Sequence, residues 1–309
     1  MNNAAATTPY RANALLTITA FALAACQLVL APLIVLPQSP VLAGVLVVVL
    51  FLSTPFNSAV LHEAVHGRLI TRSMQNDRVG RVLAICSGVA FDVLRFGHLS
   101  HHRFNRHALD RPDVIDPGQS RVYAAIRYYA HLLGGLYVSE ILATLAMLLP
   151  RNVIDRLLRR AMAKDDPTLA ILRRAASRGL DRRIARVRMD AVALVLLYGG
   201  AFYLYGAWWP LLLMGIILRG LIVSLQDNLP HYGTPAAIGA SAHNATAPRW
   251  AALFMLNQNL HAVHHDRPEL PWNALPDAVA PAERSHYGNY LALLVKQFRG
   301  PRPPTTAMP

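Results

Sequence analysis

The chain contains four long apolar stretches, which predict membrane-spanning helices. They cover residues 15–36, 41–60, 191–205 and 208–225. A helix needs about 20 apolar residues to cross the hydrocarbon core of a bilayer, and only the stretch 191–205 falls well short of that length. Short breaks at Pro37-Gln38-Ser39-Pro40 and Gly206-Ala207 join the stretches in pairs. The pattern therefore predicts two helical hairpins that anchor the chain in a membrane.

A fifth apolar stretch, residues 124–149, has an unusual length for a membrane segment. Two crossings need about 40 residues, and this stretch is much shorter. A single crossing would put the histidine-rich segments before and after it on opposite sides of the membrane. Gly134-Gly135 in its middle offers a bend. We therefore expect a re-entrant or interfacial element that returns to the face from which it entered.

Composition supports this membrane assignment. Apolar residues make up 54% of the chain and charged residues only 15%, against roughly 25% charged residues in soluble domains. The positive charge is concentrated in residues 151–188, which hold 12 basic and 4 acidic side chains. The positive-inside rule places such an insert on the cytoplasmic side. The basic residues do not form a face with interleaved aromatic side chains, so no nucleic-acid partner is expected.

The basic insert also contains an amphipathic pattern. Its apolar residues Val153, Ile154, Leu157 and Leu158 follow helical spacing between arginines. This spacing suits a helix that lies on anionic lipid headgroups, and it suits a solvated cytoplasmic hairpin equally well. Both interpretations keep the insert outside the bilayer.

These patterns predict an all-α fold. We expect a polytopic bundle of about four transmembrane helices plus the re-entrant or interfacial element, with a cytoplasmic histidine-rich helical cap. Residues 1–300 would form a single membrane domain, and the proline-rich residues 301–309 a disordered tail. The expected location is the bacterial inner membrane, with the active site on the cytoplasmic side.

Three histidine clusters supply the candidate chemistry. They contain eight of the 13 histidines, as His62 and His66 in HEAVH, His98, His101 and His102 in HLSHH, and His261, His264 and His265 in HAVHH. Neutral imidazole is the commonest protein ligand for transition metals. One ion has about four to six coordination positions, so eight imidazoles suggest two metals. Within each HxxHH cluster we expect the residues at i and i+3 to share a helix face and i+4 to turn toward a second metal.

Two other classes of metal protein compete for these residues. HEAVH matches the HExxH signature of zinc peptidases, in which Glu63 would be the general base. That interpretation uses two clustered histidines and one further ligand, and leaves five or six unexplained. A non-catalytic metal transporter predicts histidines along a path through the membrane, whereas these clusters lie outside the apolar stretches.

The three clusters together resemble the histidine boxes HxxxH, HxxHH and HxxHH of the membrane fatty acid desaturase/hydroxylase superfamily. The resemblance extends over residues ~40–276 and includes the order of helix hairpin, two boxes, helix hairpin and third box. It implies a centre of two non-haem iron ions that uses dioxygen and externally supplied electrons. The chain has no haem or ferredoxin pattern. The electrons would therefore come from a separate ferredoxin, cytochrome b5 or reductase.

The resemblance also singles out residues beside the boxes. His231, which follows Gln226-Asp227-Asn228-Leu229-Pro230, stands where the superfamily often has another ligand; the alternative is a turn histidine. Asn259 precedes the third box and would orient a ligand or hold a water on iron, unless it is a helix cap. Carboxylates near metal-bound imidazoles often accept their second N–H. The candidates for that role are Asp110, Asp113, Asp116, Asp227 and Asp266. Each of them could equally be an ordinary loop or helix-end residue. The histidines expected to be non-ligands are His107, His131, His243 and His286.

The leading functional interpretation is a desaturase that acts on a fatty acyl or lipid-like chain in the bilayer. Loss of a second hydrogen from the substrate gives an alkene, whereas addition of oxygen gives an alcohol. A hydroxylase or ketolase of the same superfamily, acting on an alkane, a carotenoid or a specialised metabolite, is therefore the alternative. The histidine boxes do not distinguish these reactions.

Overall fold

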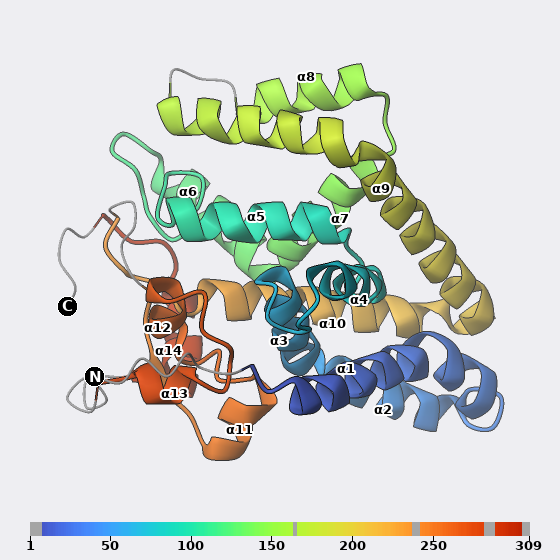
Figure 1. Cartoon of the computed structure of the whole chain (residues 1–309). Helices are drawn as coiled ribbons and strands as arrows, with labels where there is room; N and C mark the ends of the chain where they lie inside the picture. Colours follow the sequence, from blue (N-terminus) through green and yellow to red (C-terminus); the bar gives the residue numbers. More distant parts are fainter. Residues whose placement is uncertain (1–7, 163–165, 237–241, 281–287, 305–309) are drawn as a thin grey trace.

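A computed structural model describes residues 8–162, 166–236, 242–280 and 288–304 (Figure 1). The α-helices are α1 (Tyr10–Ala25), α2 (Pro40–Phe51), α3 (Thr54–Val65), α4 (Ser73–Cys86), α5 (Phe91–Phe104), α6 (Arg121–Ala130), α7 (Leu136–Ala146), α8 (Arg151–Ala161), α9 (Pro167–Tyr205), α10 (Trp209–Asn228), α11 (Arg249–Phe254), α12 (His261–Asp266), α13 (Leu275–Ala278) and α14 (Tyr290–Lys296). Other helical segments are η1 (Cys26–Val35), η2 (His131–Gly135), η3 (Gly206–Trp208) and η5 (Gln297–Arg299). Two short strands, β1 (Ala245–Thr246) and β2 (Gly288–Asn289), pair in parallel. The predicted all-α fold is confirmed.

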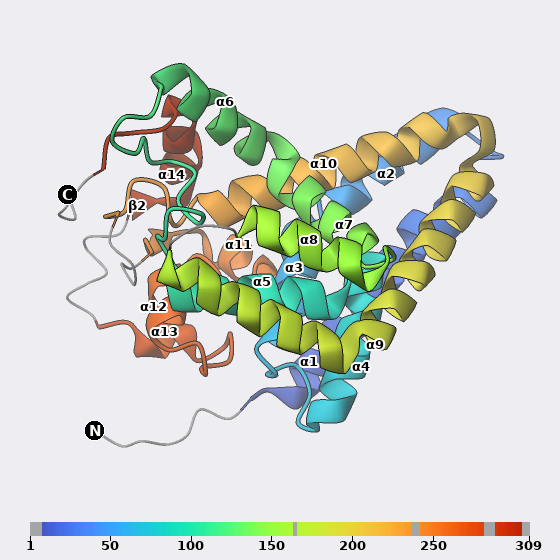
Figure 2. The ribbon, with the colours of Figure 1, turned by 90° about the horizontal axis from the view of Figure 1, so that it is seen from above.

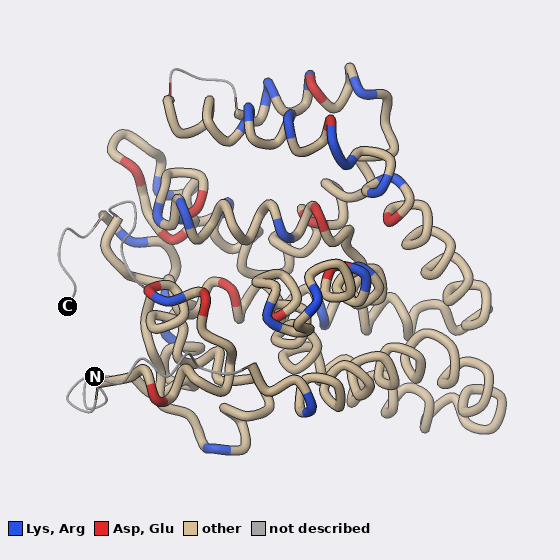
Figure 3. The backbone as a smooth tube through the Cα atoms, viewed as in Figure 1, with Lys and Arg blue, Asp and Glu red and all other residues tan. Residues whose placement is uncertain are grey.

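The longest apolar helices converge at one end of the molecule. α1 and η1 form one run of 26 residues, and α9 and α10 meet it at the same tip (Figure 2). This tip carries almost no charged side chains, which gather on the remainder of the chain (Figure 3). By length and composition, two runs of the described residues could cross a membrane, Tyr10–Val35 and Pro167–Asn228, or up to four if two bent helix pairs each count as one span.

The second predicted span is not one straight helix. The stretch 41–60 is divided into α2 and α3, which meet at an angle of 41°. Pro55 in the first turn of α3 has no backbone N–H to donate to the preceding turn. The hydroxyls of Ser53 and Thr54 instead donate to the carbonyls of Leu50 and Phe51. The bend directs the C-terminal end of α3, which carries the first histidine box, away from the axis of α2.

The stretch 124–149 bends at the predicted glycines. Gly134 has a φ of 113°, a conformation that glycine adopts without steric strain. The chain leaves α6 at Ala130, bends at Gly134 within η2 and continues as α7. Gly134 lies next to the backbone of Gly220 in α10, so two residues without side chains allow η2 and α10 to approach closely.

The basic insert folds as a helical hairpin. α8 and the first half of α9 lie side by side (Figures 1 and 2), and Ile154 of α8 is buried. Asp166 begins α9 by accepting hydrogen bonds from the backbone N–H groups of Thr168 and Leu169, a typical N-cap. Asp92 of α5 accepts hydrogen bonds from Arg183 and Arg186 of α9, which fixes the hairpin over α5.

The first residues of the tail, which the sequence predicts to be disordered over residues 301–309, form backbone hydrogen bonds. The backbone N–H of Arg302 donates to the carbonyl of Asp113 at 2.7 Å, and Ile115 donates to the carbonyl of Arg302 at 2.8 Å. The extended tail thus pairs with the loop that follows the second histidine box, because its proline-rich sequence still leaves the N–H and C=O of Arg302 free to bond. Residues 305–309 lie outside the described part of the chain.

Candidate metal centre

Nine histidines from four separate segments form two adjacent groups. α3 ends at the first box, α5 carries the second, α12 carries the third, and His231 follows the end of α10. The candidate ligand nitrogens within each group lie within 4.8 Å of one another. The first group is His62, His66, His98, His102 and His264, and the second is His101, His231, His261 and His265. The structure therefore brings all eight box histidines and His231 to one centre with two positions.

In the first group, four Nε2 atoms follow one another at short distances. His66 lies 2.8 Å from His98, which lies 3.1 Å from His102, and His102 lies 3.1 Å from His264. The Nε2 atom of His62 is buried and has no hydrogen-bond partner in the structure. Hydrogen bonds among the rings would leave this nitrogen unsatisfied, whereas a metal ion between the rings would bind it. The first group therefore fits a metal.

The second group has the same form with fewer members. The Nε2 atom of His101 lies 3.1 Å from that of His231 and 3.2 Å from that of His265. His265 in turn lies 3.2 Å from His261. Here too the Nε2 atoms point to a common position, so the second group also fits a metal.

The distances between ligands bear on the kind of coordination. A metal–imidazole bond is about 2.0–2.1 Å long. Two such ligands at a right angle lie about 2.9 Å apart, and two ligands of a tetrahedron about 3.3 Å. The observed separations of 2.8 to 3.2 Å span most of this range, so each group has the spacing of nitrogens bound to one ion. The first group also holds five histidines, one more than a tetrahedral zinc site uses.

The arrangement of the HxxHH boxes differs from our prediction. His98 and His102, at i and i+4, share the first group, while His101 at i+3 belongs to the second. His261 and His265 likewise share the second group, and His264 belongs to the first. On a helix of 3.6 residues per turn, positions i and i+4 differ by about 40° and positions i and i+3 by about 60°. The prediction that i+3 stays with i was therefore wrong, because i+4 is the nearer neighbour around the axis.

Side chains around the two groups orient some of the rings. Asp110 lies 2.7 Å from Nδ1 of His101, and Gln258 lies 3.1 Å from Nδ1 of His62. In each case Nδ1 is occupied and Nε2 remains directed at the metal position. The Asp110 contact has the geometry that fixes the tautomer of a metal-bound imidazole. Gln258 was missed in the sequence, where its only signal is its position three residues before the third box.

The other candidate acceptors have different partners. Asp113 and Asp116 bind Arg106 and Arg111. Asn259 donates to the carbonyl of Ala245. Among the described residues, Asp227 and Asp266 have no hydrogen bond to a histidine, and their role as acceptors from ligands stays a prediction.

Glu63 is also placed unlike a peptidase base. Only 3% of its surface is exposed, and its carboxylate accepts a hydrogen bond from the backbone N–H of Trp272 at 3.3 Å.

Burial is the main reason that the pKa of His264 falls well below its usual value, and the neighbouring imidazoles lower it further. A neutral imidazole is the form that binds metal. The histidines expected to be non-ligands, His107, His131 and His243, belong to neither group, and His286 lies outside the described residues.

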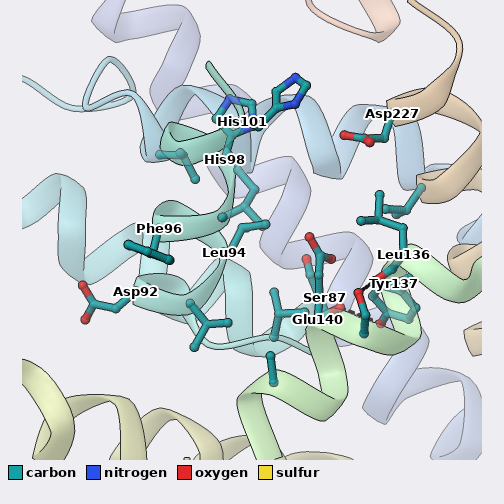
Figure 4. Close-up of a pocket in the computed structure, with 18 of the residues that line it drawn as sticks. Ser87, Asp92, Leu94, Phe96, His98, His101, Leu136, Tyr137, Glu140 and Asp227 are labelled. Atoms are coloured by element: carbon teal, nitrogen blue, oxygen red, sulfur yellow. Dashed lines mark hydrogen bonds between the residues drawn. The ribbon is translucent and has the colours of Figure 1, made fainter. Parts of the chain in front are cut away.

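A cavity of about 600 Å³ reaches the metal centre. His62, His98 and His101 lie at one end of it, as Figure 4 shows for the last two. Much of its wall is apolar and comes from α5, α7, α8 and α9, including Val93, Leu94, Phe96, Ala143, Leu158 and Leu180. The carboxylates that line this space include Glu140 and Asp227 (Figure 4). The sequence signal for Glu140, which we missed, is a lone acidic residue within the apolar stretch 124–149.

The contact between Asp110 and His101 leads to a prediction about metal affinity. Asp110→Asn is expected to weaken metal binding in the second group by about 10–100-fold, because the amide is a poorer acceptor for the ring N–H. Metal analysis after dialysis against a graded series of chelator concentrations would measure this loss. Asp116→Asn, which changes a carboxylate bound to Arg111 instead, is the matched control. Equal metal retention in both variants would contradict the role of Asp110.

Comparison with known proteins agrees with this geometry. The family model described as fatty acid desaturase matches residues 37–294. That range contains both histidine groups, the cavity-lining helices and the basic hairpin. No curated protein and no solved structure gives a match. The chain belongs to the fatty acid desaturase family.

Proposed function

We propose that this chain is a membrane-bound, dioxygen-dependent desaturase that introduces a double bond into a fatty acyl or lipid-like chain. The observation that carries the proposal is the largely apolar cavity that ends at His62, His98 and His101. Its volume of about 600 Å³ lies within the usual range for small-molecule sites. A chain in this cavity would lie with one of its carbons next to the metal centre.

The donor set fits two iron ions, each held by one histidine group. Imidazole nitrogens suit iron among several transition metals, and family membership favours iron over the others. When bound, the two ions would supply the activation of dioxygen that an unactivated C–H bond requires. The protein itself positions the substrate and excludes water from the reacting carbons. Val93, Leu94 and Phe96 would do this next to the second histidine box.

The stoichiometry of the reaction requires an electron donor. Desaturation removes two hydrogen atoms from neighbouring carbons of the substrate. Dioxygen accepts these two hydrogens, together with two further electrons and two protons, and becomes two molecules of water. The two electrons would come from a separate ferredoxin, cytochrome b5 or reductase. We place the reaction on the cytoplasmic side of a bacterial inner membrane, a proposal supported by the positively charged insert between the helices.

Mass spectrometry of lipids and polar metabolites tests this proposal. Cells that express the wild type are compared with cells that express His264→Ala, which lacks a ligand of the first group. A product lighter by two hydrogens only with the wild type would support desaturation and identify the substrate. A product heavier by one oxygen would instead assign a hydroxylase. Purified wild type that contains zinc and no iron would contradict both assignments.

A further inference from the structure

The α8–α9 hairpin carries a second hollow, distinct from the cavity at the metal centre. It has a volume of about 480 Å³ and lies between the two helices. Its lining consists of Asp155, Arg159, Arg173, Arg174, Ser177 and Arg178. Four guanidinium groups thus face one groove together with a single carboxylate. We call this hollow the arginine groove.

The positive charges of the arginine groove are not balanced by the protein. Its one carboxylate, Asp155, lies 3.4 Å from Arg151, which stands outside the groove. Within the described part of the chain, no hydrogen bond or ion pair engages any of the four groove arginines. Arg183 and Arg186, further along α9, are by contrast both paired with Asp92. Arg174 and Arg178 are also four residues apart on one helix, a spacing at which like charges repel. The groove therefore carries more positive than negative charge.

The kind of side chain indicates the kind of anion. The guanidinium group presents a planar fork of donors that binds two oxygens of a phosphate at once. The hydroxyl of Ser177 adds a donor and an acceptor at the same place. Several arginines around one hollow suit a group that carries multiple negative oxygens. We infer that the arginine groove binds a phosphate group, supplied by a lipid headgroup or by a soluble phosphate.

The arginine groove lies next to the cavity at the metal centre. This placement holds whichever reaction the metal centre catalyses. Leu158 and Gly179 line the cavity, and their chain neighbours Arg159 and Arg178 line the groove. One hairpin thus forms a wall of both hollows. A phosphate in the groove would bridge α8 and α9 through their arginines. It would hold the hairpin in place over the cavity.

A binding experiment on the full-length protein in detergent tests this inference. The double variant Arg173→Gln/Arg178→Gln removes two groove cations. The control Arg156→Gln/Arg182→Gln removes two exposed arginines of the same helices that do not line the groove. Each protein is titrated with inorganic phosphate and with short-chain phosphatidic acid in mixed micelles, and binding is followed by microscale thermophoresis. Far-ultraviolet circular dichroism verifies that both variants remain helical.

The groove variant is expected to bind phosphatidic acid at least about 10-fold more weakly than the wild type, since two charge-assisted contacts are lost. The control variant should change by less than about 2-fold. Binding of phosphatidic acid alone would identify a lipid headgroup as the source, and binding of both probes would show that a free phosphate suffices. Equal weakening in the two variants, or no binding of either probe to the wild type, would overturn the inference.

Discussion

Replacing His264 by alanine is expected to abolish product formation and to reduce the metal content from two ions per chain to one. His264 belongs to the first histidine group, and its Nε2 atom lies 3.1 Å from that of His102. Loss of a residue that only supports a ligand already costs about 10–100-fold in metal affinity or activity. Loss of the ligand itself should cost more than that. Iron analysis and turnover assays on the purified protein would measure both effects.

Two further variants test which histidine group holds which ion. His261→Ala should also remove one ion, but from the second group, so that His264→Ala/His261→Ala would hold none. His243→Ala changes a histidine outside both groups and should retain both ions and full turnover. Two ions in His264→Ala, or metal loss in His243→Ala equal to that in His264→Ala, would show that the groups are assigned incorrectly.

The sequence predicts the presence of a two-metal centre but not how the ligands are shared. The eight box histidines stand out by their spacing alone. Their division depends on how three helices are rotated about their axes, and this rotation is set by packing. His101 and His265, for example, are 164 residues apart in the chain and 3.2 Å apart in space. No periodicity within a box contains that information.

The fold was predictable to a similar degree. Apolar stretches and glycines reveal the helices and the bend at Gly134, because both depend on local composition. The angle of 99° between α4 and α5 is not visible in the same way, although it turns the second box toward the first. The bend between α2 and α3 was likewise missed. Ser53, Thr54 and Pro55 interrupt the apolar stretch only briefly, and apolar residues continue on both sides of them. Bends that depend on a few polar side chains within an apolar run escape a prediction from hydrophobicity.

A buried ion pair beside the second histidine group should be the most sensitive point for stability. Arg106 and Asp113 lie 2.8 Å apart, and their side chains are only 1% and 2% exposed. Arg106 also donates to the carbonyls of Thr234 and Pro235. Asp113 accepts a hydrogen bond from the backbone N–H of Gly233. The pair thus ties the end of the second box to the loop that carries His231.

Asp113→Asn is expected to lower the free energy of unfolding by about 3–5 kcal/mol, because it leaves the buried charge of Arg106 without its partner. Thermal and denaturant unfolding in detergent would measure this loss. Asp77→Asn breaks the more exposed pair with Arg95 and should cost no more than about 1 kcal/mol. Since Thr234 hydrogen-bonds to the carbonyl of His231, Asp113→Asn should also release metal from the second group before the first. Unfolding of both variants at the same temperature would show that the buried pair does not hold this loop in place.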